Sequence, residues 1–317
     1  MKGKKKFDMI CLGRAGVDLY ALEPNLNFMD VKHFRKSVGG SPANIAVALS
    51  TLGSRVGFIG KVSDDPFGQY VKSFMEEKGV NTEGLMIDRS GTKTSLAITE
   101  MKPLDCGVLF YRERPSDLEL LPSEIDETYL MNSQGILLSG TALSRGPSRE
   151  ACFKVLEISK GKIKVVFDLD FRASAWNNVE EAGSMYKEVG LKSDIIIGNT
   201  EEITLLGNKG VEKNIKNLIQ SGVEIVIHKK ADGGSDLYTK DGEIFKAKAF
   251  KVKAQKPFGA GDAFAGAFLY SMMNEKPLEE CLLWGNAAGA FNVLGNTCSE
   301  SMPTEKELMK FIKDYGE

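Results

Sequence analysis

Small residues directly precede an acid and a helical pattern in the segment 258–266. Gly259 and Gly261, with Ala260 between them, let backbone N–H groups approach a ligand closely, and the start of a helix favours negative charge. Asp262 follows at once, so a carboxylate stands beside this candidate anion cradle. The combination suits phosphoryl transfer, in which amides hold developing charge and the carboxylate accepts a hydroxyl proton. The structural alternative is a tight turn in which Asp262 is only a first-turn helix charge.

A second polar group combines two glycines, an amide and an acid. Gly39 and Gly40 precede a helical pattern whose first turn carries Asn44, and two glycines indicate a close backbone approach. Asp18 follows the first predicted strand, and ligands of open α/β sheets bind where strands end. A carboxylate and an amide suit a polyhydroxylated ligand. The structural alternatives are a loop-capping Asp18 and an Asn44 that satisfies local backbone.

The elements that must position these residues alternate in type along the chain. Apolar, β-branched runs predict strands over 8–12, 56–62, 135–139, 164–168, 195–198 and 224–228. Amphipathic stretches between them predict helices over 42–52, 66–78, 147–159, 179–190 and 211–221, and three further helices over 260–273, 278–294 and 304–315. Strand, helix and strand in succession predict an α/β fold, with a mostly parallel sheet covered by helices on both faces. Ser41 is expected to cap the helix over 42–52, and Gly53 to end it.

Two regions interrupt this alternation. The segments 25–36 and 84–112 contain short alternating runs without a strong helix between them, which predicts antiparallel strands in a small flap. The sequence shows no internal repeat and no low-complexity linker. We therefore expect one domain over 1–317, with the flap inserted as lid segments.

Composition excludes several classes of protein. Lys plus Arg number 41 and Asp plus Glu 43, for a net charge of −2, without the basic excess usual in nucleic-acid binders. Two histidines and five cysteines without a C-x-x-C pair leave little material for zinc sites, disulfide scaffolds or Ser-His-Asp chemistry. No apolar run approaches the ~18 residues of a membrane span. The sequence thus predicts a cytoplasmic protein with no nucleic-acid or membrane partner.

Three motifs, taken together and in this order, resemble the signatures of the PfkB/ribokinase family of sugar kinases. The first contains Gly39, Gly40 and Asn44, the second reads Asn-Thr-Glu-Glu over 199–202, and the third reads Gly-Ala-Gly-Asp over 259–262. The resemblance spans essentially the whole chain, and three motifs together are far more specific than one. It implies a ribokinase-like α/β fold with a central, mostly parallel sheet, helices on both faces and a small β lid.

The resemblance also implies roles for the first and third motifs. Asp262 would be the general base, and residues 259–261 would form the anion hole. Asp18, Gly40 and Asn44 would contact the sugar, with Gly39 beside them.

On the nucleotide side the resemblance implies ATP and Mg²⁺. Asn199 and Glu202 would organise the Mg²⁺ of Mg-ATP through waters, in keeping with the preference of Mg²⁺ for oxygen ligands and its retained water shell. Lys229 and Gly233 lie in a strand-then-glycine segment that the family places beside ATP, and Asn286 matches a position lining the adenine pocket. The alternatives are a solvated lysine at a strand end and a helix-packing role for the residues around Asn286.

One stretch departs from the family pattern. Many members carry an Asp-Thr pair ahead of the Gly-Ala-Gly-Asp run, tied to a monovalent-cation site. This chain has Lys256 and Pro257 there, which reverses the sign of the charge and removes a backbone donor. We therefore expect little activation by K⁺.

Two arginines bear on the substrate. Arg112 lies in the flap and Arg172 follows a predicted strand, and a guanidinium fork suits a carboxylate better than a neutral sugar. Members of the family that phosphorylate keto-deoxy sugar acids carry similar elements. The alternatives are an Arg112 paired with Glu113, and an Arg172 paired with Asp168 or Asp170.

Four segments together resemble one subgroup most closely, that of kinases acting on 5-dehydro-2-deoxy-D-gluconate in myo-inositol catabolism. They cover residues 12–20, 38–46, 111–113 and 256–262. On this interpretation the product is the 6-phosphate, and Arg14 adds a further positive charge near the acid.

Other functions stay open at this point. A 2-keto-3-deoxygluconate kinase or a fructokinase is the alternative within the family. A non-catalytic sugar-binding regulator on the same fold is the alternative of another class, because fold does not determine function. Lid-mediated dimers are common in the family, so a homodimer through the lid is a further hypothesis.

Overall fold

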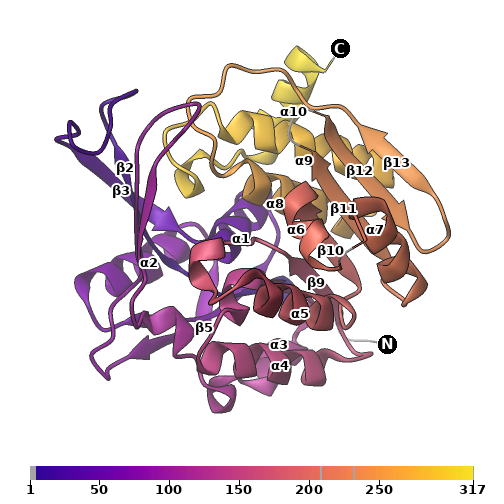
Figure 1. Cartoon of the computed structure of the whole chain (residues 1–317), viewed down its shortest axis with the longest axis horizontal. Helices are drawn as coiled ribbons and strands as arrows, with labels where there is room; N and C mark the ends of the chain where they lie inside the picture. Colours follow the sequence, from indigo (N-terminus) through magenta and orange to yellow (C-terminus); the bar gives the residue numbers. More distant parts are fainter. Residues whose placement is uncertain (1–4, 208, 231–232, 317) are drawn as a thin grey trace.

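The computed structural model describes residues 5–207, 209–230 and 233–316. Nine strands within these residues form one main sheet (Figure 1). In spatial order they are β13 (Ile244–Ala247), β12 (Gly234–Thr239), β11 (Ile225–Lys230), β10 (Ile195–Asn199), β9 (Lys164–Asp168), β8 (Ser133–Ser139), β1 (Phe7–Leu12), β4 (Val56–Ser63) and β5 (Asn81–Asp88). The pairings from β11 to β5 are parallel, and β12 and β13 add an antiparallel edge.

Alternate side chains of each central strand enter different cores. On β1, Met9 and Cys11 pack into one core cluster, whereas Ile10 and Leu12 pack into the other. This follows from the two-residue period of a strand, and burial on both faces explains why the central strands are apolar throughout.

Helices cover both faces of the main sheet (Figure 1). The core with Met9 is closed by α1 (Ser41–Leu52), α2 (Pro66–Glu77), α8 (Ala260–Met273), α9 (Leu278–Asn292) and α10 (Glu305–Tyr315). The core with Ile10 is closed by α3 (Glu127–Met131), α4 (Pro147–Ser159), α5 (Val179–Gly190), α6 (Thr200–Leu205) and α7 (Val211–Gln220). None of the described helices is long and apolar enough to span a membrane.

The predicted strands and helices are all present, each within two residues of its expected ends. The helix start at residue 41 differs from the prediction. Gly40 is the N-cap of α1, and the Ser41 hydroxyl donates to the Asp168 carboxylate at 2.7 Å instead of capping the helix.

A second sheet of four strands stands beside the main sheet. Its order is β3 (Phe34–Gly39), β2 (Gly16–Ala21), β6 (Leu96–Thr99) and β7 (Val108–Tyr111). The predicted flap was wrong in extent. Residues 84–88 pair with β4 in the main sheet, and β2, which alternation did not reveal, runs parallel to β6.

Candidate active site

One cavity of about 690 Å³ lies between the small sheet and the carboxyl ends of central main-sheet strands. Alternate residues of the small sheet line it, including Asp18 and Tyr20 of β2. Asp168, Asn199 and Lys229 line it from the ends of β9, β10 and β11. The parallel topology therefore brings polar side chains from distant segments to one edge, where such folds bind ligands.

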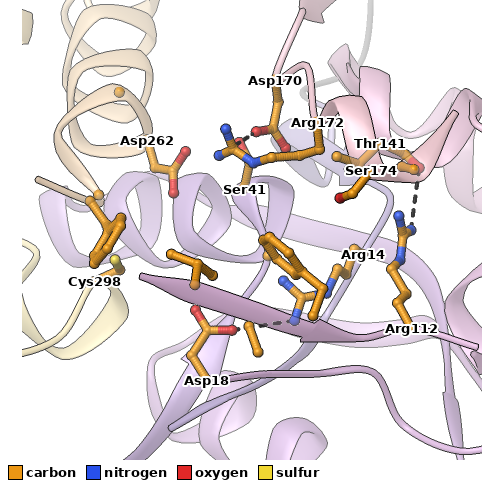
Figure 2. A pocket seen from close by; sticks show the side chains of 18 of the residues that line it. Arg14, Asp18, Ser41, Arg112, Thr141, Asp170, Arg172, Ser174, Asp262 and Cys298 are labelled. Carbon is orange, nitrogen blue, oxygen red and sulfur yellow. Dashed lines mark hydrogen bonds and ion pairs between the residues drawn. The ribbon is translucent and has the colours of Figure 1, made fainter. Parts of the chain in front are cut away.

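Asp262 lies in the first turn of α8 and faces this cavity (Figure 2). Its carboxylate accepts a hydrogen bond from the Asn44 amide at 2.7 Å. Burial raises the pKa of Asp262 to about 6, the Asp170 charge adds to the rise, and the hydrogen bond from Asn44 opposes it. A carboxylate with a raised pKa, held by an amide at a helix start, has the properties of a general base that works near neutral pH.

The anion cradle predicted at residues 259–261 has the expected helix geometry. Gly259 is the N-cap of α8 with φ 84°, a left-handed conformation that favours glycine, and no side chain caps the helix. A side chain on Gly259 would also collide with Asn292, whose Oδ1 would lie 2.3 Å from the added Cβ. Gly259 and Gly261 line the cavity, whereas Ala260 is not among the described lining residues. The first amides of α8 are thus uncapped at the positive end of its dipole.

Lys229 lies beside the cradle. Its ammonium would be 3.2 Å from a Cβ placed on Gly261, and it lies 3.7 Å from Asp168. Burial lowers the pKa of Lys229, but Asp168 and the neighbouring acids raise it further, so the net shift is upward. The side chain is therefore a charged group in the site and not the solvated lysine of the alternative interpretation.

The two glycines before α1 make room for Asp18 and Arg14. A Cβ on Gly39 would fall 2.0 Å from the Asp18 carboxylate carbon, and one on Gly40 would fall 2.3 Å from the Arg14 carbonyl oxygen. Gly40 also has φ 106°, in the region that favours glycine. In the structure Gly39 packs against Asp18 and Asn44 donates to Asp262. Neither is among the described lining residues, and their contacts with the sugar stay predictions.

Asp18 and Arg14 form a buried pair. Arg14 donates to Asp18 at 3.3 Å and to the Ser95 hydroxyl at 2.8 Å, and the Tyr20 hydroxyl donates to the other Asp18 oxygen at 3.2 Å. Both charged side chains line the cavity. The pair is thus orientated from two sides, which rejects the loop-capping interpretation of Asp18.

Both predicted arginines line the cavity, but each already has an acidic partner. Arg172 pairs with Asp170 at 2.8 Å, as one alternative proposed, and this attraction raises its pKa. Arg112 pairs with Asp117, not Glu113, and donates to the Thr141 carbonyl at 3.2 Å. Figure 2 shows Arg112 reaching toward Thr141, and Arg172 reaching toward Asp170.

Several lining residues were missed by sequence reasoning. Arg145 lies in the loop before α4, and Ser174 lies in a short 3-10 helix, η4 (Ala173–Ala175), after β9. Neither belongs to a recognisable motif. Asp168 and Asp170 were considered only as partners of Arg172, although the end of a strand was a usable signal for both. Burial raises the pKa of Asp168 to about 7, and Lys229 opposes the rise.

Asn199 and Glu202 hold each other at the start of α6. The Asn199 side chain accepts from the Glu202 amide at 2.9 Å, and Glu202 accepts from the Asn199 amide at 2.7 Å and from the Phe171 amide at 3.1 Å. Across the described residues, no group of three or more His, Cys, Asp or Glu is placed to hold a metal directly. Asp168 nevertheless has a buried carboxylate oxygen without a hydrogen-bond partner in the described part of the chain. This oxygen-rich donor set fits a Mg²⁺ that keeps its waters.

Two residues predicted on the nucleotide side lie apart from the lining. Asn286 in α9 donates to the Ala247 and Lys248 carbonyls at 3.1 and 3.2 Å and accepts from Ser235. Its amide therefore ties α9 to the antiparallel edge of the main sheet. Gly233 directly precedes β12, and neither residue is among those described as lining the cavity.

Comparison with known proteins places this geometry in a family. The model of the pfkB family carbohydrate kinases matches residues 6–305. The 5-dehydro-2-deoxygluconokinase of Photobacterium profundum is 45% identical over 98% of this chain and 96% of that relative. The protein with the same name from Bacillus subtilis is 40% identical, over 98% and 97%.

Solved structures agree with the fold. The fructokinase of Xylella fastidiosa with bound ATP superposes with a TM-score of 0.86 at 26% identity, covering 98% of this chain and 99% of that one. A putative Ribokinase II from E. coli, in complex with ATP and Mg²⁺, superposes with a TM-score of 0.90 at 23% identity, over 98% and 100%. The predicted ribokinase-like fold is confirmed, and the chain belongs to the pfkB family of carbohydrate kinases.

Proposed function

We propose that this kinase transfers the γ-phosphoryl group of ATP to the 6-hydroxyl of 5-dehydro-2-deoxy-D-gluconate. The P–O bond between the β- and γ-phosphates breaks, a bond from O6 to phosphorus forms, and the hydroxyl proton passes to Asp262. The products are ADP and the 6-phosphate. The observation that carries the proposal is one cavity that joins a half-buried carboxylate at an uncapped helix start to several guanidinium groups.

The transfer step rests on Asp262 and the cradle. Asp262 takes the proton of the attacking hydroxyl, and Asn44 keeps its carboxylate orientated through the 2.7 Å hydrogen bond. The amides of residues 260–262 and the Lys229 ammonium stabilise negative charge that develops on the phosphoryl oxygens. A non-catalytic regulator would have no use for a base with a raised pKa at this position.

The acidic substrate is supported by the guanidinium groups. The Arg172 side chain is 52% exposed, and it contacts Asp170 and the Phe171 carbonyl. A guanidinium carries five N–H donors, so Arg172 has further donors for a ligand. Arg112 and Arg145 line the same cavity, and Arg14 lies beside Asp18. A carboxylate bound there would accept charge-assisted hydrogen bonds from the remaining N–H donors of these groups, whereas a neutral sugar would accept weaker ones. The names of the relatives support the same substrate.

ATP and Mg²⁺ complete the proposal. Asn199, Glu202 and Asp168 would hold the hydrated ion, which neutralises charge on the phosphates when bound. Gly233 and Asn286 stay our prediction for the nucleotide side, where Asn286 would act through the backbone it holds.

The assembly and setting belong to the same proposal. The chain would work in the cytoplasm as one kinase domain, with the small sheet as its lid. Large apolar side chains on β7 and β3 are exposed, among them Leu109, Tyr111 and Phe34. Burying them against a second copy would give a homodimer through the lid, which light scattering would detect as twice the mass of one chain.

The test is ATP consumption against a matched panel of acceptors. The panel contains 5-dehydro-2-deoxygluconate, 2-keto-3-deoxygluconate, fructose and ribose, each assayed over a range of concentrations. We expect the highest kcat/KM for 5-dehydro-2-deoxygluconate and phosphate on carbon 6 of the product. Faster turnover of fructose or ribose than of either acid would reject the substrate class, and no turnover of any acceptor would favour the regulator.

A further inference from the structure

Lys256 is a lysine whose side chain has no exposed surface. The exposed fraction of Lys256 is 0%. Lysine side chains are almost never fully buried unless they are paired with an acid. Across the described residues no carboxylate lies within ion-pair distance of its ammonium. Three neutral oxygens surround it instead: the Phe258 carbonyl at 2.9 Å, the Asn292 carbonyl at 3.0 Å and the Asn292 Oδ1 at 2.8 Å. Burial accordingly lowers the pKa of Lys256.

The three oxygens come from two elements that meet behind the cradle. Phe258 directly precedes Gly259, the N-cap of α8. Asn292 is the last residue of α9, where the helix dipole places partial negative charge. The ammonium therefore joins the loop that begins the cradle to the negative end of a neighbouring helix, with one of its three N–H groups available to each oxygen.

The loop before α8 packs tightly against the end of α9, so neither Asn292 nor Gly259 has room to move. The Asn292 amide also donates to the Cys298 carbonyl at 2.8 Å, which fixes the side-chain oxygen that Lys256 uses. A Cβ on Gly259 would lie 2.3 Å from Asn292 Oδ1 and 2.9 Å from Cys298 Sγ. Without a cation, three oxygen dipoles would converge on an empty centre, and the loop would relax away from α9. The cradle amides would move with it.

We propose that Lys256 serves as a built-in monovalent cation, whose ammonium fills this oxygen cage and holds the anion cradle in its catalytic position. Lys256 does not line the cavity, so it is a positioning residue acting through residues 258–261. The inference rests on the proposed role of the cradle but not on the identity of the sugar.

The decisive variant is Lys256→Ala, which removes the ammonium and leaves its cage. A cradle displaced by about 1 Å is expected to lower kcat by roughly 10²-fold. The KM values for ATP and sugar should change less than about threefold, because the ground-state contacts are elsewhere. Lys253→Ala is the matched control, since Lys253 is an exposed lysine of the same segment and its loss should leave kcat unchanged.

Rescue of kcat by small cations distinguishes a positioning role of Lys256 from a general contribution to the stability of the fold. Ammonium, K⁺ or ethylammonium should enter the vacated cage and raise the kcat of Lys256→Ala at least about tenfold. Tetramethylammonium at equal ionic strength should not, because it is too large for the cage and its methyl groups keep the oxygens away from the charge. A folded variant with unchanged kcat, or one with lost kcat that no cation restores, would overturn the proposal.

The wild-type enzyme keeps the proposal testable if Lys256→Ala does not fold. Because the cage is already filled, replacing tetramethylammonium by K⁺ should change wild-type kcat by less than about twofold. Activation of the wild type by K⁺ beyond about threefold would show that the cradle needs an external ion, contrary to the proposal. Each kcat is measured with whichever sugar the wild type phosphorylates, so a wrong sugar assignment leaves this result readable.

Discussion

In the proposed mechanism, the chemistry depends most directly on Asp262. Replacing it in Asp262→Asn keeps the side-chain shape but removes the proton acceptor, so kcat should fall by about 10²–10⁴-fold. ATP binding, measured by calorimetry, should change little. Asp241→Asn, at an exposed acid, is the control and should behave as wild type. A kcat within a few-fold of wild type would remove Asp262 from the role of base.

The pH profile should report the same carboxylate. Burial first, and then the Asp170 charge, raise the pKa of Asp262 to about 6. Below that pH the group is protonated and cannot accept a proton, so kcat/KM should decline about tenfold per pH unit on the acid side. Above it the base is charged and activity reaches a plateau. The decline of kcat/KM on the acid side should persist in Asp168→Asn. A kcat/KM that stays constant down to pH 5 would contradict the assignment of the decline to Asp262.

The sequence predicted the site best where the residue types restrict the backbone strongly. A glycine pair and a Gly-Ala-Gly-Asp run limit the possible backbone geometry, and both lie where predicted. It was less successful at residues with ordinary types. Ser41 looks like a helix cap in the sequence, but its hydroxyl donates to Asp168, 127 positions away.

At the scale of elements, the contact between β3 and β2 positions Asp18 on the proposed sugar side of the site. Gly39→Ala would place a methyl group 2.0 Å from the Asp18 carboxylate carbon, so Asp18 must move. The lost hydrogen bonds to sugar hydroxyls should raise KM for the sugar about tenfold or more, with KM for ATP unchanged. Asp18→Asn should give the same pattern. An equal rise in both KM values would indicate general damage to the fold.

The start of α6 carries the second prediction at this scale. Glu202→Ala removes the acceptor of the Asn199 and Phe171 amides and a carboxylate from the proposed metal site. The Mg²⁺ concentration for half-maximal activity should rise, and kcat should fall more than sugar affinity. The free energy of unfolding should drop by about 1 kcal/mol with the lost capping contact. A Mg²⁺ titration identical to wild type would remove Glu202 from the metal site.

Helix and strand boundaries were predictable where apolar periodicity was strong. The helices α4, α5 and α8 begin and end at the predicted residues, because each has an amphipathic or apolar pattern between clear breakers. The strands β12 and β13 were not foreseen. β13 is the edge strand, and alternate residues of it are exposed. β12 is mostly buried, but it begins with Gly234, Ser235 and Asp236, so its apolar signal is weak.

At the scale of the whole molecule, the proposed substrate choice depends on side chains that two sheets bring together. Arg172→Ala should lower kcat/KM for the sugar acid about tenfold to hundredfold, since a charge-assisted contact is lost. Turnover of fructose, however slow, should change less than about threefold. Arg89→Ala, at an exposed arginine that does not line the cavity, is the matched control. An equal loss for acid and neutral sugars would show that Arg172 supports the fold and not the preference.

The amino-acid sequence by itself determined the α/β class, the central parallel strands and the family, because these follow from local periodicity and from rare motifs in a set order. It also pointed to Asp262, Gly259 and Asp18. Local patterns carry no information on contacts between distant segments, so the partners of these residues were out of reach.

Only the tertiary structure decided how the charges are paired. It joined Arg112 to Asp117 and Arg172 to Asp170, and it turned Asn44 toward Asp262. It also enclosed the Lys256 ammonium among carbonyl oxygens. The sequence alone showed only that a lysine stands where many family members carry an acid. The physical reason is that parallel strands gather their carboxyl ends at one edge, and close packing there determines which side chain each charge meets.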